Sequence, residues 1–308
     1  MQEENKDLRI LSNTVEVIGT LKSKNLEIKT AKTSGKKYMS GQITVLSKSD
    51  NKVNEHRINV FMMESSKLFK GIETVKNEYK SIEEVGEEEA DRIRVTGELD
   101  FNQYYNREGK LVEFNEIKGV FFNRVDNLDE SEDRAIATID AVVEGFIDKM
   151  DQDGLPTGEK EIKGFSVGWG NNVIQLKDTI VKKELAEAMQ NLYQPGSTGQ
   201  LTFKLNNYVE VEEQEEEVSV SHGFGSQEVV GNLVAKNFVN NIEVIGGQVP
   251  YLGSIEYTQE EIEQAHKVNE LNLQTLQKPA PTTPQVKEGF DSPSAENKTS
   301  LDSEIPDF

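Results

Sequence analysis

Cysteine is absent from the 308-residue sequence, which excludes disulfides and thiolate metal sites and is typical of a reducing compartment. The only histidines, His56, His222 and His266, lie far apart, which argues against a histidine-based zinc site. The sequence contains no run of about 18 apolar residues, so we expect no membrane span. The first ten residues lack the apolar core of a secretion signal. These absences predict a cytoplasmic protein without a cofactor or a metal.

Motifs of common catalytic sites are missing as well. The glycine-bearing stretches 221–226 and 245–248 are not followed by the Gly-Lys-Ser/Thr of a phosphate loop. The acidic residues of 212–217 form a run rather than a spaced set of ligands, which is typical of a solvated face and not of a metal site. No Gly-x-Ser-x-Gly elbow is present. We therefore expect no catalytic residues and no enzymatic activity.

Charge is distributed unevenly along the chain, whose formal net charge is −21. Residues 12–126 contain 19 Lys and Arg against 19 Asp and Glu, whereas residues 135–257 contain 8 against 19 and residues 258–308 contain 4 against 10. All seven arginines lie at or before Arg134. The asymmetry indicates an anion-binding first part joined to acidic, partner-binding parts. Charge alone favours the simpler alternative, an acidic soluble protein with an average first domain.

Hydrophobic periodicity predicts five strands and one helix in residues 12–126. Apolar residues that alternate with polar ones indicate strands, and apolar residues three or four apart over 64–82 indicate an amphipathic helix. Gly19, in the middle of the first strand, would allow the bend that a small barrel needs. The order of three strands, a helix and two strands is that of the five-stranded OB barrel. The expected strands are 14–28, 38–46, 58–62, 92–101 and 112–125.

The same order recurs in residues 135–257, after a charged linker at 127–134. Gly145 lies at the centre of the first expected strand, as Gly19 does in the first copy. A long, acidic and then glycine-bearing connection is expected at 212–237. We therefore predict a mainly β protein with two OB-like five-stranded barrels, each with one helix between strands three and four. In the second copy the expected elements are strands 136–150, 162–167, 173–181, 199–211 and 238–245 and a helix at 182–193.

The C-terminal part is expected to be a helix and a tail. Residues 258–277 form the helix, with Thr258 as its cap and Glu261 as the capping-box partner. Residues 278–308 are rich in Pro, Thr and Ser and too poor in aliphatic residues to offset their ordering entropy, so we expect a disordered acidic tail. Its tip fits a partner with an apolar pocket and a basic clamp for the terminal carboxylate. The expected partner-binding residues are Asp302, Glu304, Ile305, Pro306, Asp307 and Phe308.

Lysines and aromatic residues are concentrated in the first barrel. Six lysines lie within residues 22–37, opposed by Glu27 alone. In an OB barrel, strands two and three and their neighbouring loops form the binding groove. Lysines there neutralise phosphates, and aromatic rings stack on bases without reading sequence. The candidate nucleic-acid-binding residues are Lys22, Lys24, Lys29, Lys32, Lys36, Lys37, Tyr38, Arg57, Phe61, Arg92, Arg94, Tyr104, Tyr105, Arg107 and Lys110.

Several of the aromatic residues are open to a second interpretation. Phe61, Phe101 and Phe114 fit the core of a barrel as well as its binding face. Tyr104 and Tyr105 are adjacent, so in a strand they point to opposite faces and one of them should lie outside the core.

Outside this group, other interpretations also stay open. Arg92 and Arg94 suit DNA contacts or ion pairs with the acidic run 87–91. Trp169, the only tryptophan, could stack on a base, but we expect it to be packed in the core. The second barrel lacks the basic and aromatic pattern, so we expect it to serve protein interaction or dimerisation.

Two stretches resemble bacterial single-stranded-DNA-binding proteins. The ending DSEIPDF is similar to their acidic Pro-Phe tip, although Asp307 separates Pro306 from Phe308 and Glu304 stands where Asp is common. The stretch VTGELDFNQYYNREGKLVEF, residues 95–114, resembles their fourth-strand hairpin. This second resemblance implies base contacts by Tyr104, Tyr105 and Phe114.

The resemblance also carries expectations about function. It implies a non-catalytic protein that binds single-stranded DNA in replication, recombination and repair. The tip would shield the groove when DNA is absent and recruit partner enzymes when DNA displaces it. Two unequal barrels in one chain look like a bacteriophage variant, acting in the cytoplasm of the bacterial host. A homo-oligomer is compatible with this family.

Two other classes of protein fit part of the sequence. All-β spacing, an acidic surface and the lack of catalytic residues fit a virion or scaffold protein equally well, but this reading leaves the tail tip and the lysine gradient unexplained. A nuclease with an OB domain would need spaced carboxylates that hold Mg²⁺, and the sequence offers no such set. Sequence-independent binding of single-stranded DNA is therefore the leading prediction.

Overall fold

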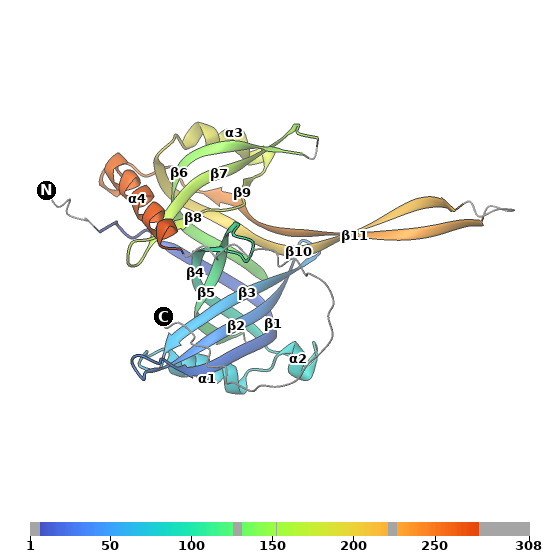
Figure 1. The fold of residues 1–308 in the computed structure, drawn as a ribbon, viewed down its shortest axis with the longest axis horizontal. Coiled ribbons are helices and arrows are strands. Elements are labelled where there is room, and N and C mark those ends of the chain that lie inside the picture. The colour runs from blue at the N-terminus through green and yellow to red at the C-terminus, as the bar shows by residue number, and fades with distance from the viewer. Residues whose placement is uncertain (1–6, 126–130, 152, 221–226, 277–308) are drawn as a thin grey trace, which may run out of the picture.

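A computed structural model describes residues 7–125, 131–151, 153–220 and 227–276. Its strands form one 11-stranded sheet that closes on itself twice (Figure 1). Within the described ranges, no helix has the length and apolar character that crossing a bilayer requires. The tail 278–308, with its expected tip residues, lies outside the described residues.

The first closed circuit runs β1-β2-β3-β5-β4 and back to β1. The β3–β5 pairing is parallel and the others are antiparallel, which gives the expected OB order. A Cβ at Gly19 would collide with the carbonyl oxygen of Leu46, so glycine permits the close approach of β1 and β2 where the barrel closes. The strands of this first barrel are β1 Asn13–Thr30, β2 Lys37–Ser49, β3 Lys52–Met63, β4 Arg92–Tyr105 and β5 Leu111–Arg124.

The second circuit repeats this order as β6-β7-β9-β11-β10 and back to β6, with β8 added to β7. The β9–β11 pairing is parallel, as β3–β5 is in the first barrel. Gly145 has no close neighbour for a Cβ, so it does not have the role of Gly19. The strands of this second barrel are β6 Arg134–Met150, β7 Pro156–Gly168, β8 Asn172–Gln175, β9 Thr179–Val181, β10 Ser197–Val220 and β11 Gln227–Gly247.

The two barrels are fused through antiparallel pairing of β1 with β6, from Asn13↔Ile139 to Ile18↔Arg134. Inward side chains of both barrels, such as Leu21 and Phe203, belong to one continuous apolar cluster. Burial of each such side chain contributes about 1.5–3 kcal/mol. The shared strand pair and the shared core hold the outer faces of the two barrels in a fixed relation.

Helices close the barrels and fasten the C-terminal part. The expected helix 64–82 forms two helices, α1 (Phe69–Glu78) and α2 (Ile82–Val85), because Ser81 starts a new helix with its own capping box. Helix α3 (Lys183–Leu192) precedes β10. Helix α4 (Gln259–Thr275) has the expected Thr258–Glu261 capping box and packs Ile262 and Ala265 against the second barrel.

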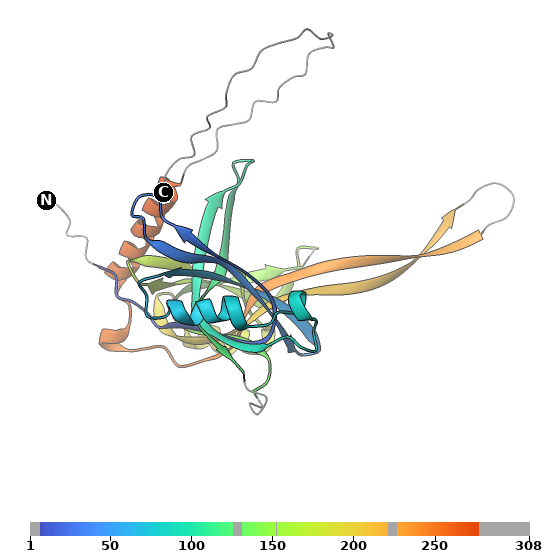
Figure 2. The ribbon, with the colours of Figure 1, turned by 90° about the horizontal axis from the view of Figure 1, so that it is seen from below.

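Two expectations for the second barrel are wrong. The strand expected at 173–181 is divided into β8 and β9, with Asp178 at a positive φ of 50° between them. The connection expected at 212–237 is instead strand for most of its length, because β10 and β11 continue as a hairpin. We call residues 205–220 and 227–241 the arm. Among described residues they form ladders only with each other, and they extend away from the barrels (Figures 1 and 2).

Candidate nucleic-acid interface

Two aromatic residues, one exposed and one half-buried, lie together on the outer face of β2 and β3. Alternate residues of β3 point inward into the core, so Phe61 points outward and is 67% exposed. The ring of Tyr38 lies beside it, with the ring centroids 5.2 Å apart. Of the two interpretations of Phe61, the structure therefore selects the surface one. We call Tyr38 and Phe61 the platform.

Lysines surround the platform on the turn between β1 and β2. Lys29 is paired across the ladder with Tyr38, and its ammonium lies 3.4 Å from Glu27. Lys32, Lys36 and Lys37 are exposed and form no ion pair with any residue that the structure describes. We call these three residues the basic turn, because their charge is open to an anionic ligand.

Two lysines of the candidate set are engaged with other residues of the first barrel. Lys24 is only 9% exposed, and its ammonium donates to the carbonyl of Lys76 at 2.8 Å and lies 3.2 Å from Glu84. It therefore joins β1 to the helices. Lys22 lies 2.5 Å from Glu55 on β3. The structure thus does not bring Lys24 to the platform, and it pairs Lys22 with a carboxylate.

The arginines of the set lie in two places. Arg57 is exposed on the outer face of β3, two residues from Asn59 and four from Phe61, with Glu55 at 3.7 Å. Arg92 bonds Asp133 at 2.7 Å and Arg94 lies 3.5 Å from Glu16. Both side chains also bond Ser131, so they fasten the linker between the barrels. The ion pairs of Arg92 and Arg94 that the described residues show are therefore with Asp133 and Glu16.

The β4–β5 hairpin carries the remaining candidates. Tyr104 is exposed and meets Phe114 edge-on, with the ring centroids 6.2 Å apart. Tyr105 points to the opposite face, as adjacent strand residues do. Arg107 and Lys110 are exposed in the turn. Phe101 and Phe114 are half-buried, so their burial fits neither a core residue nor a fully exposed residue of the binding face.

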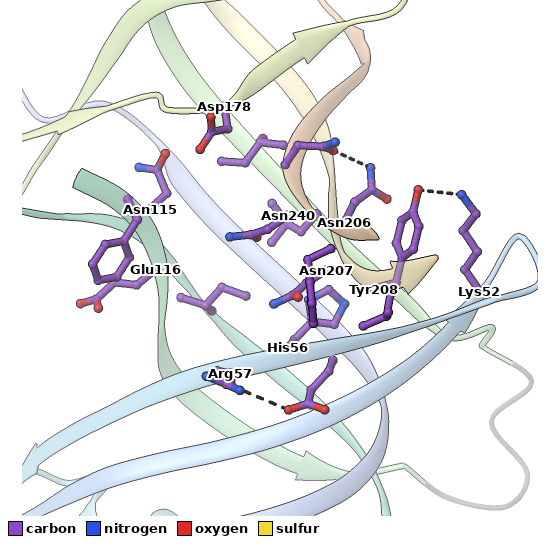
Figure 3. A pocket seen from close by; sticks show the side chains of 18 of the residues that line it. Lys52, His56, Arg57, Asn115, Glu116, Asp178, Asn206, Asn207, Tyr208 and Asn240 are labelled. Carbon is purple, nitrogen blue, oxygen red and sulfur yellow. Dashed lines mark hydrogen bonds and ion pairs between the residues drawn. The ribbon is translucent and has the colours of Figure 1, made fainter. Parts of the chain in front are cut away.

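A cleft of about 1250 Å³ lies where the outer face of β3 meets the second barrel and the base of the arm (Figure 3). Asparagines from both barrels line it, together with Phe114, Tyr208 and Phe238. Phe238 is 76% exposed. We call this space the amide cleft. Its asparagines are Asn51, Asn59, Asn115, Asn206, Asn207, Asn240 and Asn241.

Hydrogen bonds between the barrels fix the walls of the amide cleft. Asn115 on β5 donates to the carbonyl of Gln175 at 2.7 Å and accepts from the backbone of Lys177 at 2.8 Å. On the other side, Asn54 accepts from the backbone N–H of Asn207 at 2.9 Å. Lys52 donates to the Tyr208 hydroxyl at 2.6 Å. The cleft is therefore a built feature of the fused barrels.

Every cation that lines the amide cleft already has a carboxylate partner. Lys52 lies 2.7 Å from Glu210, Lys177 lies 2.9 Å from Glu113, and Arg57 lies near Glu55. The hydrogen bond with Glu210, followed by that with Tyr208, raises the pKa of Lys52. The cleft is thus polar without an excess of positive charge.

His56 lies inside the first barrel, next to the amide cleft. Its ring nitrogen Nε2 lies 3.0 Å from the Ser47 hydroxyl in a buried site. Burial lowers its pKa from the ordinary value to about 4. The ring is therefore neutral near pH 7. Within the described ranges, no group of His, Asp and Glu has the arrangement of a metal site.

Sequence reasoning missed the contribution of the second barrel. Trp169, expected in the core, is 86% exposed in the turn between β7 and β8, so that expectation is wrong. The flanking residues, Gly168 and Gly170, have no side chains that could cover the indole ring. Two Asn-Asn pairs in the sequence, 206–207 and 240–241, could have indicated the cleft. They lie opposite one another in the β10–β11 register.

Known proteins supply the following comparisons. The solved structure of the single-stranded DNA binding protein from Thermus aquaticus is 12% identical in sequence, with a TM-score of 0.48. The match includes 82% of the present chain and 99% of the Thermus aquaticus chain. The mitochondrial single-stranded DNA binding protein Rim1 from S. cerevisiae is 13% identical in sequence, with a TM-score of 0.27. The match includes 40% of the present chain and 99% of the Rim1 chain. No curated protein matches the sequence. The YorF family profile matches residues 12–279, and the chain therefore belongs to the YorF family.

Proposed function

We propose that this protein binds single-stranded DNA without catalysis and without reading its sequence. The observation that carries the proposal is the exposed ring of Phe61, with the half-buried Tyr38 beside it, next to the lysines of the basic turn, which have no ion-pair partner among the described residues. Stacking a base on an exposed ring removes apolar surface of both from water, and each stacked base contributes roughly 1–3 kcal/mol. Lysines release counterions from the phosphates. A duplex hides the base faces, so the platform selects unpaired strands.

The test is a fluorescence-anisotropy titration of labelled oligo-dT with the wild type and Phe61→Ala. We expect the substitution to weaken binding at least about fivefold, because one stacking contact is lost. Phe121→Ala is the matched control, since Phe121 is also exposed on the first barrel but lies outside the platform and the cleft. Equal affinities for Phe61→Ala and Phe121→Ala would refute the platform as a base-binding site.

We further propose that the protein acts in DNA replication, recombination and repair. It would do so as a bacteriophage-type variant in the cytoplasm of a bacterial host. Residues 302–308 recruit partner enzymes and, with the rest of the acidic tail, compete with DNA for the basic turn. Removal of residues 278–308 should strengthen binding to oligo-dT at low salt. Unchanged binding after this truncation would contradict a competing tail.

The alternative of a virion or scaffold protein does not account for the platform. A structural protein has no need of an exposed aromatic ring beside a cluster of lysines, whereas a groove for unpaired bases requires both. Strong dependence of oligo-dT binding on salt would separate the two, because only phosphate contacts produce it.

A further inference from the structure

The outer face of β3 connects the platform to the amide cleft. The outward residues run from Phe61 through Asn59 and Arg57 to Val53, a path of roughly 27 Å at the rise of a strand. Arg57, Asn59 and Val53 themselves line the cleft. A strand that stacks on Phe61 and follows β3 therefore enters the cleft without leaving the protein surface.

The size of the cleft favours part of a polymer over a small molecule. Its volume of about 1250 Å³ exceeds the range of about 300–1,000 Å³ that is typical of pockets for small ligands. It is also formed by both barrels, so a single groove of one OB barrel does not account for it. A segment of a chain that is already bound to the first barrel fits these dimensions.

The chemistry of the lining favours bases over phosphates. The cations of the cleft are already paired with the carboxylates of Glu210, Glu113 and Glu55. A phosphate that entered the cleft would therefore place a further negative charge next to three carboxylates. Amide side chains instead offer a donor and an acceptor side by side, which pair with the edge of a base. Asn207 and Asn240 face one another across the β10–β11 ladder at the base of the arm.

Phe238 supplies a ring for stacking in this polar setting. It lies opposite Val209 in the ladder and is 76% exposed, although such a large apolar side chain is more favourably buried. Asn240 and Asn241 follow it on the same strand and line the same cleft. A ring with amides beside it is the arrangement that binds an unpaired base by its face and by its edge.

We propose that the amide cleft holds unpaired bases of the strand bound on the platform, with Phe238 stacking on a base and the phosphates directed to solvent. This inference rests on the proposed function. It gives the second barrel a part in binding DNA. Because the cleft contacts bases and its cations are already paired, its contribution does not depend on salt, in contrast to that of the basic turn.

The test compares Phe238→Ala with the wild type on an oligo-dT of about 35 nucleotides, which exceeds the span of two barrels. We expect at least about a fivefold loss of affinity, the same at low and at high salt. On a deoxyribose-phosphate chain of equal length without bases, the substitution should have no effect. Phe238→Tyr should restore binding because it restores the ring. Phe121→Ala is again the control, and thermal unfolding of each variant verifies the fold.

The first two outcomes separate this inference from the proposed function. If Phe61→Ala weakens binding and Phe238→Ala does not, the cleft inference is overturned and the platform stands. If Phe238→Ala weakens binding to the abasic chain as much as to oligo-dT, Phe238 does not contact bases and the inference is again overturned. If Phe238→Ala alone weakens binding to oligo-dT, the cleft binds bases but the platform does not hold the strand, so the inference of a strand that runs from the platform into the cleft is overturned. If neither substitution has an effect, both proposals fail.

Discussion

The β1–β2 turn of the first barrel and the β6–β7 turn of the second occupy equivalent positions in one topology, yet they carry opposite charge. The first turn presents Lys32, Lys36 and Lys37 without carboxylate partners among the described residues. The second presents Asp151 and Asp153, and the lysines beside it are paired. Those pairs are Lys149–Glu159, Lys160–Asp148 and Lys182–Glu159.

The third strands of the barrels differ as much as their turns. Strand β3 has 12 residues, and its outward side chains form a face beside β2. Strand β9 has three residues, all of them buried. The second barrel therefore has no counterpart of the platform. The comparison teaches that inward residues fix the barrel topology, while strand length and outward residues decide whether a barrel has a binding face.

The largest expected effect tests the contrast between the turns. Replacing Lys32, Lys36 and Lys37 together by Gln should weaken binding to oligo-dT about 100-fold at low salt, since three phosphate contacts are lost. The slope of log affinity against log salt should fall by about 2, at about 0.7 per phosphate on a single strand. Anisotropy titrations across a salt series measure both quantities.

Two variants control this prediction. Lys70→Gln removes an exposed lysine of α1, and the affinity should stay within about threefold of the wild type. Asp153→Lys places a cation on the second turn, where no platform adjoins it, so little gain of affinity is expected. A gain at Asp153 as large as the loss at the basic turn would break the comparison between the barrels.

The next effect concerns the stability of the first barrel in acid. Because the pKa of His56 is about 4 in the folded protein and about 6.5 in the unfolded chain, the unfolded chain binds more protons between these values. The free energy of unfolding should thus fall as pH decreases from 6.5 to 4, by up to about 3 kcal/mol, with no contribution from His56 above that window.

Urea denaturation of the wild type and His56→Gln at pH 7 and pH 4.5 measures this term. The variant should lose less stability than the wild type on acidification, while the carboxylates contribute equally to both proteins. The same loss in both would show that His56 titrates normally in the folded state.

The smallest effect is expected at Trp169. Because its side chain is 86% exposed, Trp169→Ala should change the free energy of unfolding by no more than about 0.5 kcal/mol. Binding to oligo-dT should also be unchanged, since Trp169 lines neither the platform nor the cleft. A cost of about 3–5 kcal/mol would instead place the ring in a packed core.

The sequence predicts well what depends on local periodicity. The alternation around Val15, Val17 and Leu21 predicts the first strand, and the Thr258–Glu261 capping box predicts the start of α4. The outward position of Phe61 stayed ambiguous, because an isolated aromatic residue between apolar neighbours fits either face. The burial of its two neighbours, Val60 and Met62, resolves the direction in the structure.

Features that depend on contacts distant in the sequence were beyond such reasoning. Lys24 belongs to a basic cluster in the sequence, but its bond to the Lys76 carbonyl arises only when the fold brings the two helices beside β1. The amide cleft joins Asn59 of one barrel to Asn207 and Asn240 of the other, and only the fusion through β1 and β6 brings them together. The arm escaped prediction because its acidic composition is that of a loop.

The most direct measurement is the affinity of the full chain for labelled oligo-dT and for a duplex of equal length, at low and high salt. The proposed function predicts tight, salt-sensitive binding to the single strand and much weaker binding to the duplex, whose base faces cannot reach Phe61. Equal affinity for the single strand and the duplex would show that the protein binds DNA by charge and not by contacts with base faces. No binding to oligo-dT even at low salt would contradict the central claim.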